Sequence, residues 1–462
     1  MMYDTIILNG NIVDETRIYK GSICIRGEKI ALVQEGELPE GEEFQAERVI
    51  PAEGYYLFPG AVDAHMHIGE YGADFEDMET STMAAAAGGV TTCIDMPLNL
   101  YSPSVLNRGI FFEKRRRLEE ESYVDFCMWG AFVPENTDQL LGLHEAGAAG
   151  MKCFLSGGGN DFHAPGLGTV RAALKELYRF GGLAGFHCED YSITRYEREA
   201  VLKNKIDGRQ AFLDSRPLVS ELIATQSILF LAEETGARVH ICHVSHPRVA
   251  ELIAQAKERG VDVTAETCSH YLTFTCGDYL KKGCSFGCAP PLRDGEAREG
   301  LWDCIRSGVL DFISSDHSPG MLKNRDDTMQ PTYQSGFGIS SVQTMFQTVY
   351  DQGVNKRGVS PAVLARCLSA NPARRFGIYG RKGALKAGFD ADIVLLDPSL
   401  PWTVHAQNLF YKQKFSAFEG LTGTGTIKEV LIRGKSAVHE GKIKIGKGYG
   451  EFISGNPSLR SV

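Results

Sequence analysis

Short apolar runs alternate with longer amphipathic stretches through the middle of the chain. Such runs are typical of strands buried on both faces, and the stretches between them have the apolar spacing expected of helices. The helix-like stretches include residues 80–88, 104–121, 219–234 and 247–259, and the strand-like runs are residues 57–65, 90–97, 124–132, 149–155, 183–187, 238–244, 261–268 and 311–316. Eight strands that alternate with helices predict an α/β fold, a (β/α)8 TIM barrel over residues 56–380.

Both ends of the chain have a different sequence pattern, in which short β-type runs are separated by turn residues. Residues 5–8 and 22–25 are such runs near the N-terminus, and residues 390–396 and 427–432 are their counterparts near the C-terminus. Neither end is long enough to bury a core alone, so we expect residues 1–55 and 381–440 to form one small β-sandwich subdomain together. Residues 441–462 are rich in Gly, Lys and Ser, which predicts a poorly ordered tail.

Composition narrows the class of protein. The 462 residues are 43% hydrophobic and 23% charged, which is ordinary for a globular protein and excludes collagen-like and mostly disordered chains. The net charge of −10 gives no general electrostatic footprint for nucleic acid or an anionic membrane surface. The sequence has no apolar run long enough for a transmembrane helix, and its start lacks the features of a signal peptide. The twelve cysteines contain no CxxC pair, so we interpret them as reduced thiols of a cytoplasmic protein.

Metal-type side chains stand at the ends of five predicted strands. His65 and His67 are two residues apart, so they point to the same face of a strand and can reach one metal. An isolated pair of this kind arises easily by chance, but His187, His243 and Asp316 follow other strands of the same predicted barrel. Lys152 lies inside an apolar run, where it is either a buried ion-pair partner or part of the site. Coincidence at five strand ends is improbable, and a metal site is the simpler interpretation.

This donor set is typical of zinc, although manganese, cobalt and iron accept the same ligands. Three or four of the residues would serve one metal ion. All six would serve two ions, provided that Lys152 supplies a bridging anion. A lysine can do so only as a carbamate, formed by reaction with carbon dioxide, and the residues alone leave this point open.

The motifs of the chain resemble those of the cyclic amidohydrolases, a group that includes allantoinases, dihydropyrimidinases or hydantoinases, and dihydroorotases. The resemblance covers nearly the whole chain and rests on Pro59-Gly60-Ala61-Val62-Asp63-Ala64-His65-Met66-His67, Gly88-Gly89-Val90-Thr91-Thr92, Met151-Lys152-Cys153-Phe154, His187-Cys188-Glu189, His243-Val244-Ser245, Glu266-Thr267-Cys268-Ser269-His270-Tyr271, Cys288-Ala289-Pro290-Pro291-Leu292-Arg293 and Ser315-Asp316-His317-Ser318-Pro319.

The resemblance implies a site with two divalent metals that hydrolyses a cyclic amide. One metal would be held by His65, His67, Lys152 and Asp316, and the other by the Lys152 carbamate, His187 and His243. A metal-bridging hydroxide would be the nucleophile, and Asp316 would act first as general base and then as general acid. The resemblance also implies a homotetramer that acts on a small cyclic ureide.

Positions that contact substrate in this family separate its branches. Gly157 stands where dihydropyrimidinases and hydantoinases usually carry a tyrosine, and Gly69 stands where dihydroorotases usually carry an arginine. The run Asn160-Asp161-Phe162 is similar to allantoinases, whereas Gly69, Tyr71 and Ser269 depart from their usual pattern. Ala289 would offer main-chain hydrogen bonds to the ring amide. Ser156 is either a polar contact to the substrate or a loop serine bonded to its own backbone.

The leading hypothesis is therefore the hydrolysis of allantoin to allantoate. The alternative is a hydantoinase or dihydropyrimidinase that acts on another cyclic ureide, and a noncatalytic scaffold relative is a third interpretation. Strand alternation predicts that Cys153, Cys188 and Cys242 point toward the helices and that His240 points away from His243. His317 is interpreted as structural, and residues 317–338 are predicted to form a mobile loop over the site.

Overall fold

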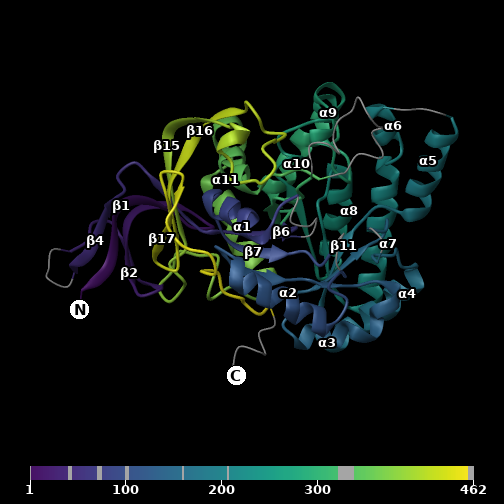
Figure 1. The fold of residues 1–462 in the computed structure, drawn as a ribbon, viewed down its shortest axis with the longest axis horizontal. Helices are drawn as coiled ribbons and strands as arrows, with labels where there is room; N and C mark the ends of the chain where they lie inside the picture. The colour runs from purple at the N-terminus through teal and green to yellow at the C-terminus, as the bar shows by residue number, and fades with distance from the viewer. Residues whose placement is uncertain are drawn as a thin grey trace.

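A barrel of parallel strands lies beside a separate β-sheet that carries the N-terminus (Figure 1). The computed structural model describes residues 2–39, 44–69, 75–98, 103–158, 161–204, 208–320 and 338–455. Within these residues, two groups of strands pair in chain order, β6-β7-β8 and β9 to β14. The predicted TIM barrel is thus confirmed, with strands β6 (Ala61–Met66), β7 (Val90–Asp95), β8 (Asp125–Met128), β9 (Gly130–Ala131), β10 (Met151–Phe154), β11 (Leu183–His187), β12 (Arg238–Ile241), β13 (Val263–Cys268) and β14 (Phe312–Ser314).

The barrel closes where its last strand returns to its first. The backbone N–H of Ser315 donates to Asp63 Oδ1 at 3.0 Å, and Met66 forms a parallel bridge with His317. The predicted strand at residues 57–65 divides at Gly60, because β5 (Tyr56–Pro59) pairs with the other sheet and only β6 belongs to the barrel.

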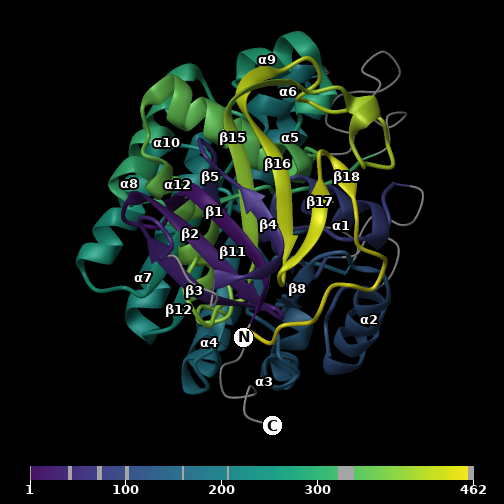
Figure 2. The same ribbon diagram turned by 90° about the vertical axis from the view of Figure 1, so that its left-hand side faces the viewer.

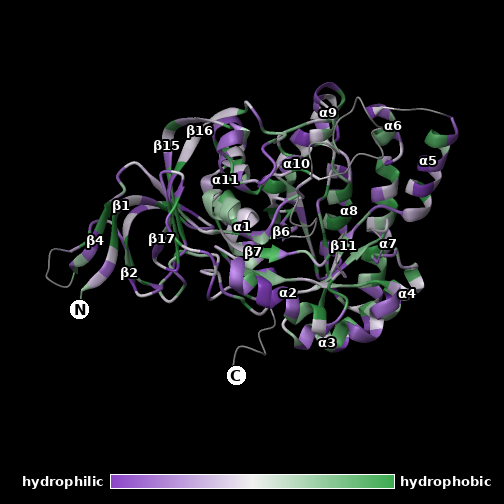
Figure 3. Ribbon diagram, viewed as in Figure 1, coloured by the Kyte–Doolittle hydropathy of each residue, from purple (hydrophilic) through white to green (hydrophobic). Residues whose placement is uncertain are grey.

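Helices cover the outside of the barrel, with polar residues toward solvent. The barrel strand β7 is buried along its whole length, whereas α2 on the outside is mostly hydrophilic (Figure 3). Among the described residues, no helix combines the length and the hydropathy needed to cross a bilayer. The helices that follow the strands are α1 (Met78–Ala87), α2 (Arg108–Glu121), α3 (Leu140–Glu145), α4 (Leu167–Arg179), α5 (Tyr191–Lys203), α6 (Arg209–Asp214), α7 (Leu218–Thr235), α8 (Pro247–Glu258), α9 (Cys276–Lys282), α10 (Gly295–Ser307), α11 (Val342–Tyr350), α12 (Pro361–Ala365) and α13 (Asn371–Arg375).

Trp129 fills the barrel axis below the strand ends. Its indole is fully buried and packs edge-on against Phe376, with ring centroids 5.2 Å apart. A Cβ atom at Gly150, just before β10, or at Gly185 on β11 would lie 2.4 or 2.7 Å from the indole, so a side chain at either position would clash with it. The interior is therefore a packed core that ends beneath the functional face, as in other barrels of this type.

The second sheet contains strands from both ends of the chain, as predicted. Its order is β18-β17-β16-β15-β5-β1-β2-β3, and β4 pairs with β1 (Figure 2). The junction between the two ends is the antiparallel pair of β5 and β15. The remaining strands are β1 (Tyr3–Val13), β2 (Ile18–Arg26), β3 (Lys29–Glu35), β4 (Ala46–Pro51), β15 (Ile393–Thr403), β16 (Thr422–Ile432), β17 (Lys435–His439) and β18 (Lys442–Ile443).

The buried Lys382 ammonium joins the barrel to this sheet. Its Nζ atom lies 2.5 Å from Asp125 Oδ2 on β8, 2.8 Å from Asp392 Oδ2 and 3.0 Å from Asp390 Oδ2. Burial alone would lower the pKa of Lys382, but the three carboxylates outweigh it and raise the pKa well above its usual value. The nearby carboxylates offset the free energy needed to bury the ammonium, which would strongly destabilise the fold if it had no partner.

The prediction of a poorly ordered tail is wrong for residues 441–455. Glu451 O accepts a hydrogen bond from Phe126 N at 2.9 Å, and Ile453 N donates to Phe126 O at 2.8 Å, so this segment adds to the edge of β8. Ile453 is buried against the barrel interior. Phe452 also packs on Phe111 and Phe126, so a few apolar residues anchor this polar stretch, a feature too small to predict from composition. Residues 456–462 lie outside the described part of the chain.

Candidate metal centre and active site

Four histidines and one aspartate from the ends of four barrel strands line a single pocket of about 160 Å³. They are His65, His67, His187, His243 and Asp316, which are the predicted site residues except Lys152. All five are at least nine-tenths buried. The pocket is also lined by Ser156, Gly157 and Ala289, so both predicted substrate contacts lie beside the histidines.

Asp316 brings the first two histidines together. Its Oδ1 atom lies 3.2 Å from His65 Nε2 and 3.3 Å from His67 Nε2. Burial raises the pKa of Asp316, but the neighbouring imidazoles of His65 and His67 outweigh this effect and lower it to about 2. The carboxylate is therefore ionised at neutral pH and presents an oxygen to the same point as two imidazole nitrogens.

His187 and His243 form a second pair on the adjoining strands. The Nδ1 atom of His187 lies 3.0 Å from Nε2 of His243, while His187 Nε2 lies 2.7 Å from Glu189 Oε2. Glu189 in turn accepts a hydrogen bond from Arg216. The ring of His187 also stacks on Phe154, with centroids 5.1 Å apart. One nitrogen of His187 is thus held by a carboxylate, which leaves the other directed at His243.

Lys152 lies among the histidines without an ion-pair partner. Its Nζ atom is buried, has no hydrogen-bond partner in the described structure, and lies 4.8 Å from the centre of the Phe154 ring. The interpretation of Lys152 as a structural ion-pair partner is therefore wrong for the described residues. An unpaired ammonium is costly to bury, so the position calls for a group that the chain itself does not provide.

Three of the site histidines, His65, His187 and His243, are neutral in this environment. Burial, and then the nearby Lys152 ammonium, lower the pKa of His65 to about 4. Burial also lowers the pKa of His187, and it holds the pKa of His243 well below its usual value. Neutral imidazoles keep a free lone pair, which is the form that binds a metal.

Two site residues have left-handed backbone. The φ angle is 37° at His243 and 43° at Asp316, a region that non-glycine residues rarely occupy and that clusters at functional sites. The turn at His243 ends the alternation of β12, so His243 faces the pocket although it is an odd number of residues from His240.

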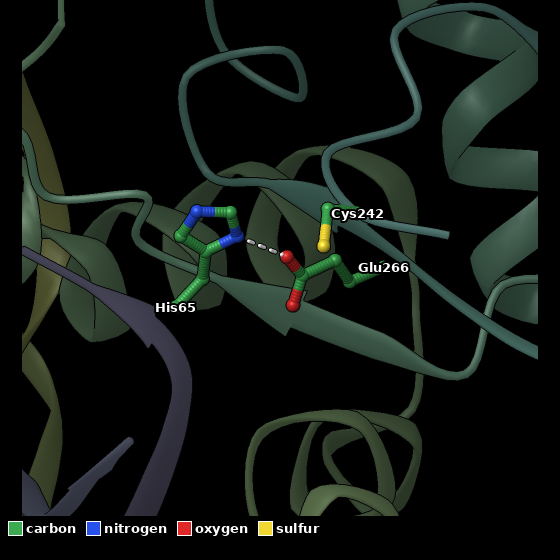
Figure 4. Close-up of side chains that lie close together, drawn as sticks. All are labelled: His65, Cys242 and Glu266. Carbon is green, nitrogen blue, oxygen red and sulfur yellow. Dashed lines mark hydrogen bonds and ion pairs between the residues drawn. The ribbon is translucent and has the colours of Figure 1, made fainter. Parts of the chain in front are cut away.

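The predicted directions of His240 and Cys242 are consequently wrong. His240 lies inside the barrel, 3.5 Å from Glu266 Oε2, and Cys242 lies close to His65 and Glu266 (Figure 4). Cys188 does point outward, where its thiol lies beside Thr225 of α7. Burial raises the pKa of Cys242 to about 12, so this thiol stays protonated under the site.

Glu266 supports His65 from below and is not among the predicted site residues. Its Oε1 atom lies 2.5 Å from His65 Nδ1, and Figure 4 shows this contact beside Cys242. Burial would raise the pKa of Glu266, but His65 and His240 outweigh burial and lower it strongly. Glu266 and Glu189 thus have the same role. Each binds one ring nitrogen of a histidine and so directs the second nitrogen of that ring into the pocket.

The residues present fit a centre of two divalent metals. Asp316, His65 and His67 offer three donor atoms within 4.8 Å of one another, and His187 and His243 offer two nitrogens that face each other. Lys152 lies among them without a hydrogen-bond partner in the described structure. Nitrogen and carboxylate donors of this kind suit zinc and its neighbours.

Comparison with known proteins identifies the family. The sequence profile described as "Amidohydrolase family" matches residues 56–437. The chain belongs to the amidohydrolase family. It is 38% identical over 462 residues to an allantoinase from Bacillus velezensis, with 98% of both chains covered. It is also 35% identical over 444 residues to an allantoinase from Deinococcus radiodurans, covering 96% of this chain and 97% of the relative.

Solved structures with this amidohydrolase fold are close in shape. An L-hydantoinase (dihydropyrimidinase) from Arthrobacter aurescens superimposes with a TM-score of 0.94 at 30% identity, over 98% of this chain and 100% of the other. A D-hydantoinase gives a TM-score of 0.89 at 29% identity, with 98% of each chain covered. Both comparisons extend over the barrel and the terminal β-sheet.

The other predicted site positions have mixed outcomes. Ser156 lines the pocket and also donates to Gly157 O at 3.3 Å, so both of its proposed roles are compatible with the structure. His270 is buried near Asp316, and neither of its ring nitrogens has a hydrogen-bond partner among the described residues. His317 is structural in its contacts, since its Nε2 lies 2.7 Å from Glu76 Oε2. Tyr71, Asn160 and residues 321–337 of the predicted loop lie outside the described residues.

Proposed function

We propose that this amidohydrolase hydrolyses a ring amide of a cyclic ureide, with allantoin as substrate and allantoate as product, in the breakdown of purines. The observation that carries the proposal is the convergence of four buried imidazoles and an ionised aspartate on one pocket. The substrate follows from the relatives named allantoinase, which match this chain over nearly its full length. A water molecule would break the amide C–N bond, leaving a carboxylate and a neutral nitrogen.

The donor set supports a centre of two metals, most simply zinc, with manganese, cobalt or iron as substitutes. His65, His67, Lys152 and Asp316 would hold one metal, and Lys152, His187 and His243 the other. Lys152 would do so as a carbamate, because an ammonium cannot bind a cation and a carbamate would satisfy the buried Nζ atom. When bound, the metals would activate water and polarise the ring carbonyl.

Asp316 is the group that we propose moves the proton. Its ionised carboxylate would accept a proton from the attacking water and deliver it to the ring nitrogen that leaves. The second proton of that water is released to solvent as the new acid ionises. The hydrogen bonds of Glu266 and Glu189 would hold His65 and His187 in place throughout.

Gly157 supports the choice of substrate. It lines the pocket with a φ of 74°, a backbone conformation that disfavours the tyrosine of hydantoinases, and it places no side chain in the pocket. The polar substituent of allantoin would then lie near Ser156, and the main chain at Ala289 would bind the ring amide. The overall shape of the L-hydantoinase favours the second candidate, a hydantoinase-type hydrolase of another cyclic ureide.

We also propose that the enzyme works in the cytoplasm as a homotetramer. All twelve cysteines are free thiols, which suits a reducing compartment. Helix α7 exposes Val219, Ile223 and Phe230 on one face, and a row of exposed apolar side chains is a common mark of contact between subunits. Sedimentation of the purified protein would test the assembly.

A substrate panel with metal analysis on the same sample tests the function. We expect two metals per chain and a kcat/KM for allantoin well above those for hydantoin and dihydrouracil. A higher rate on dihydrouracil would favour the hydantoinase-type candidate. A protein without metals and without turnover would instead be a scaffold relative.

A further inference from the structure

A second pocket of about 360 Å³ adjoins the catalytic pocket, and Ser156 and Arg216 line both of them. The rest of its wall comes mainly from α5, which begins directly after the His187-Cys188-Glu189 strand end. The second pocket, which we call the arginine chamber, is lined by three arginines, Arg195, Arg198 and Arg216, and by one carboxylate, that of Glu199. A ligand in the catalytic pocket would therefore lie next to it, with Ser156 and Arg216 at the boundary.

The charges of the arginine chamber do not cancel. Arg195 Nε pairs with Glu199 Oε1 at 2.8 Å, and Arg216 pairs with the buried Glu189. Arg198 makes no hydrogen bond or ion pair within the described part of the chain. One positive charge is thus left over in a pocket wall, in a protein whose net charge is −10. The guanidinium of Arg198 is exposed to solvent, and its positive charge favours an anion in this pocket.

Arg216 gives the chamber a fixed wall. Glu189 holds its guanidinium, while Arg293 Nη1 donates to its backbone carbonyl at 3.1 Å. Arginine binds carboxylates through two parallel hydrogen bonds, so Arg198 and its neighbours are suited to this anion in particular. Ring opening of a neutral cyclic ureide creates a carboxylate that the substrate lacks.

We propose that the arginine chamber is a subsite for a carboxylate on the ligand, and that it takes the carboxylate formed by ring opening as the product leaves the metals. This inference rests on the proposed function for its ligand, although the preference for a carboxylate over an uncharged amide follows from the chamber alone. The carboxylate could also belong to the substrate, as an acidic substituent on its ring.

The test compares ligands that differ only in charge. Calorimetry on the holoenzyme would measure Kd for allantoate and for its uncharged primary amide, with wild type, Arg198→Gln and the control Arg179→Gln on exposed α4. We expect Arg198→Gln to raise Kd for allantoate on the order of fivefold and to leave the amide unchanged. Added salt should weaken allantoate binding to wild type more than to this variant. Equal effects on both ligands, or none, would overturn the subsite.

A second arm separates the two sources of the carboxylate. The ratio of kcat/KM for 5-(2-carboxyethyl)hydantoin to that for 5-(2-carbamoylethyl)hydantoin would be measured in the same three proteins. A ratio that falls in Arg198→Gln while allantoate binding is unchanged would assign the chamber to the substrate and overturn its role for the product. If allantoin is not hydrolysed but carboxylate binding still depends on Arg198, the proposed function fails and the subsite stands.

Discussion

The Nδ1 atom of His187 and the Nε2 atom of His243 face each other at 3.0 Å. The two residues belong to neighbouring strand ends, and the left-handed backbone of His243 directs its ring toward His187. On the far side of His187, Glu189 accepts the hydrogen bond that fixes the ring. With its Nε2–H donated to Glu189, His187 keeps Nδ1 as the acceptor in this contact, and Nδ1 is therefore the nitrogen that a metal would bind.

Replacing Glu189 with glutamine should weaken the metal held by His187. The carboxylate selects the tautomer of His187 that leaves Nδ1 unprotonated, and its loss typically costs about 10–100-fold in metal affinity. Titration of the enzyme with a competing chelator would measure the affinity of each metal. The control Glu176→Gln, on exposed α4, should bind both metals as wild type does, and the same result for Glu189→Gln would contradict the role of Glu189.

Replacing Asp316 with asparagine should lower kcat by at least about 10³-fold, because the variant can neither accept nor deliver the proton. Thermal unfolding should remain cooperative, since asparagine keeps the shape of the side chain. Asp303→Asn on exposed α10 serves as the control. Turnover near the wild-type rate with metals bound would show that another group moves the proton.

Replacing Lys152 with methionine should separate metal binding from stability. The variant cannot form a carbamate, so we expect it to lose the metals and all turnover. The metal-free variant should nevertheless be more stable than metal-free wild type, by about 1–3 kcal/mol, because it removes a buried ammonium without a hydrogen-bond partner. Urea unfolding of both proteins in chelator would measure this difference, and a less stable variant would mean that Lys152 has a structural role.

Replacing Lys382 with methionine should destabilise the fold by about 3–5 kcal/mol at pH 7, since three carboxylates lose their shared cation. Burial raises the pKa of Asp390, but Lys382 and its neighbours outweigh burial and lower it to about 2, below the usual 3.8. This contribution to stability is present above pH 3.8 and is lost as the pH falls to about 2.

Urea unfolding at pH 7 and at pH 3 would test both parts of this prediction. The loss of stability between the two pH values should be smaller in Lys382→Met than in wild type. The exposed control Lys175→Met should behave as wild type does. A variant as stable as wild type at pH 7 would show that the cluster contributes little to folding.

The period of two along a strand is enough to predict that His65 and His67 share a face, and the unusual charge of Lys152 is visible in its apolar run. The same rule fails when it is counted from His243, because the backbone turns left-handed there; His240 and Cys242, two residues apart, both face inward. Glu266 and Glu189 stand close to the histidines in sequence motifs, but which carboxylate reaches which imidazole depends on how the strands are arranged in space.

The packing around Trp129 restricts how substrate enters the enzyme and how product leaves it. Because its indole packs with Phe376 and other buried side chains inside the barrel, the barrel is closed at that end and is not a channel. Incoming reactant and departing product then share one entrance on the loop side. Residues around that entrance can therefore set the rate of product release independently of the rate at which the amide bond is hydrolysed.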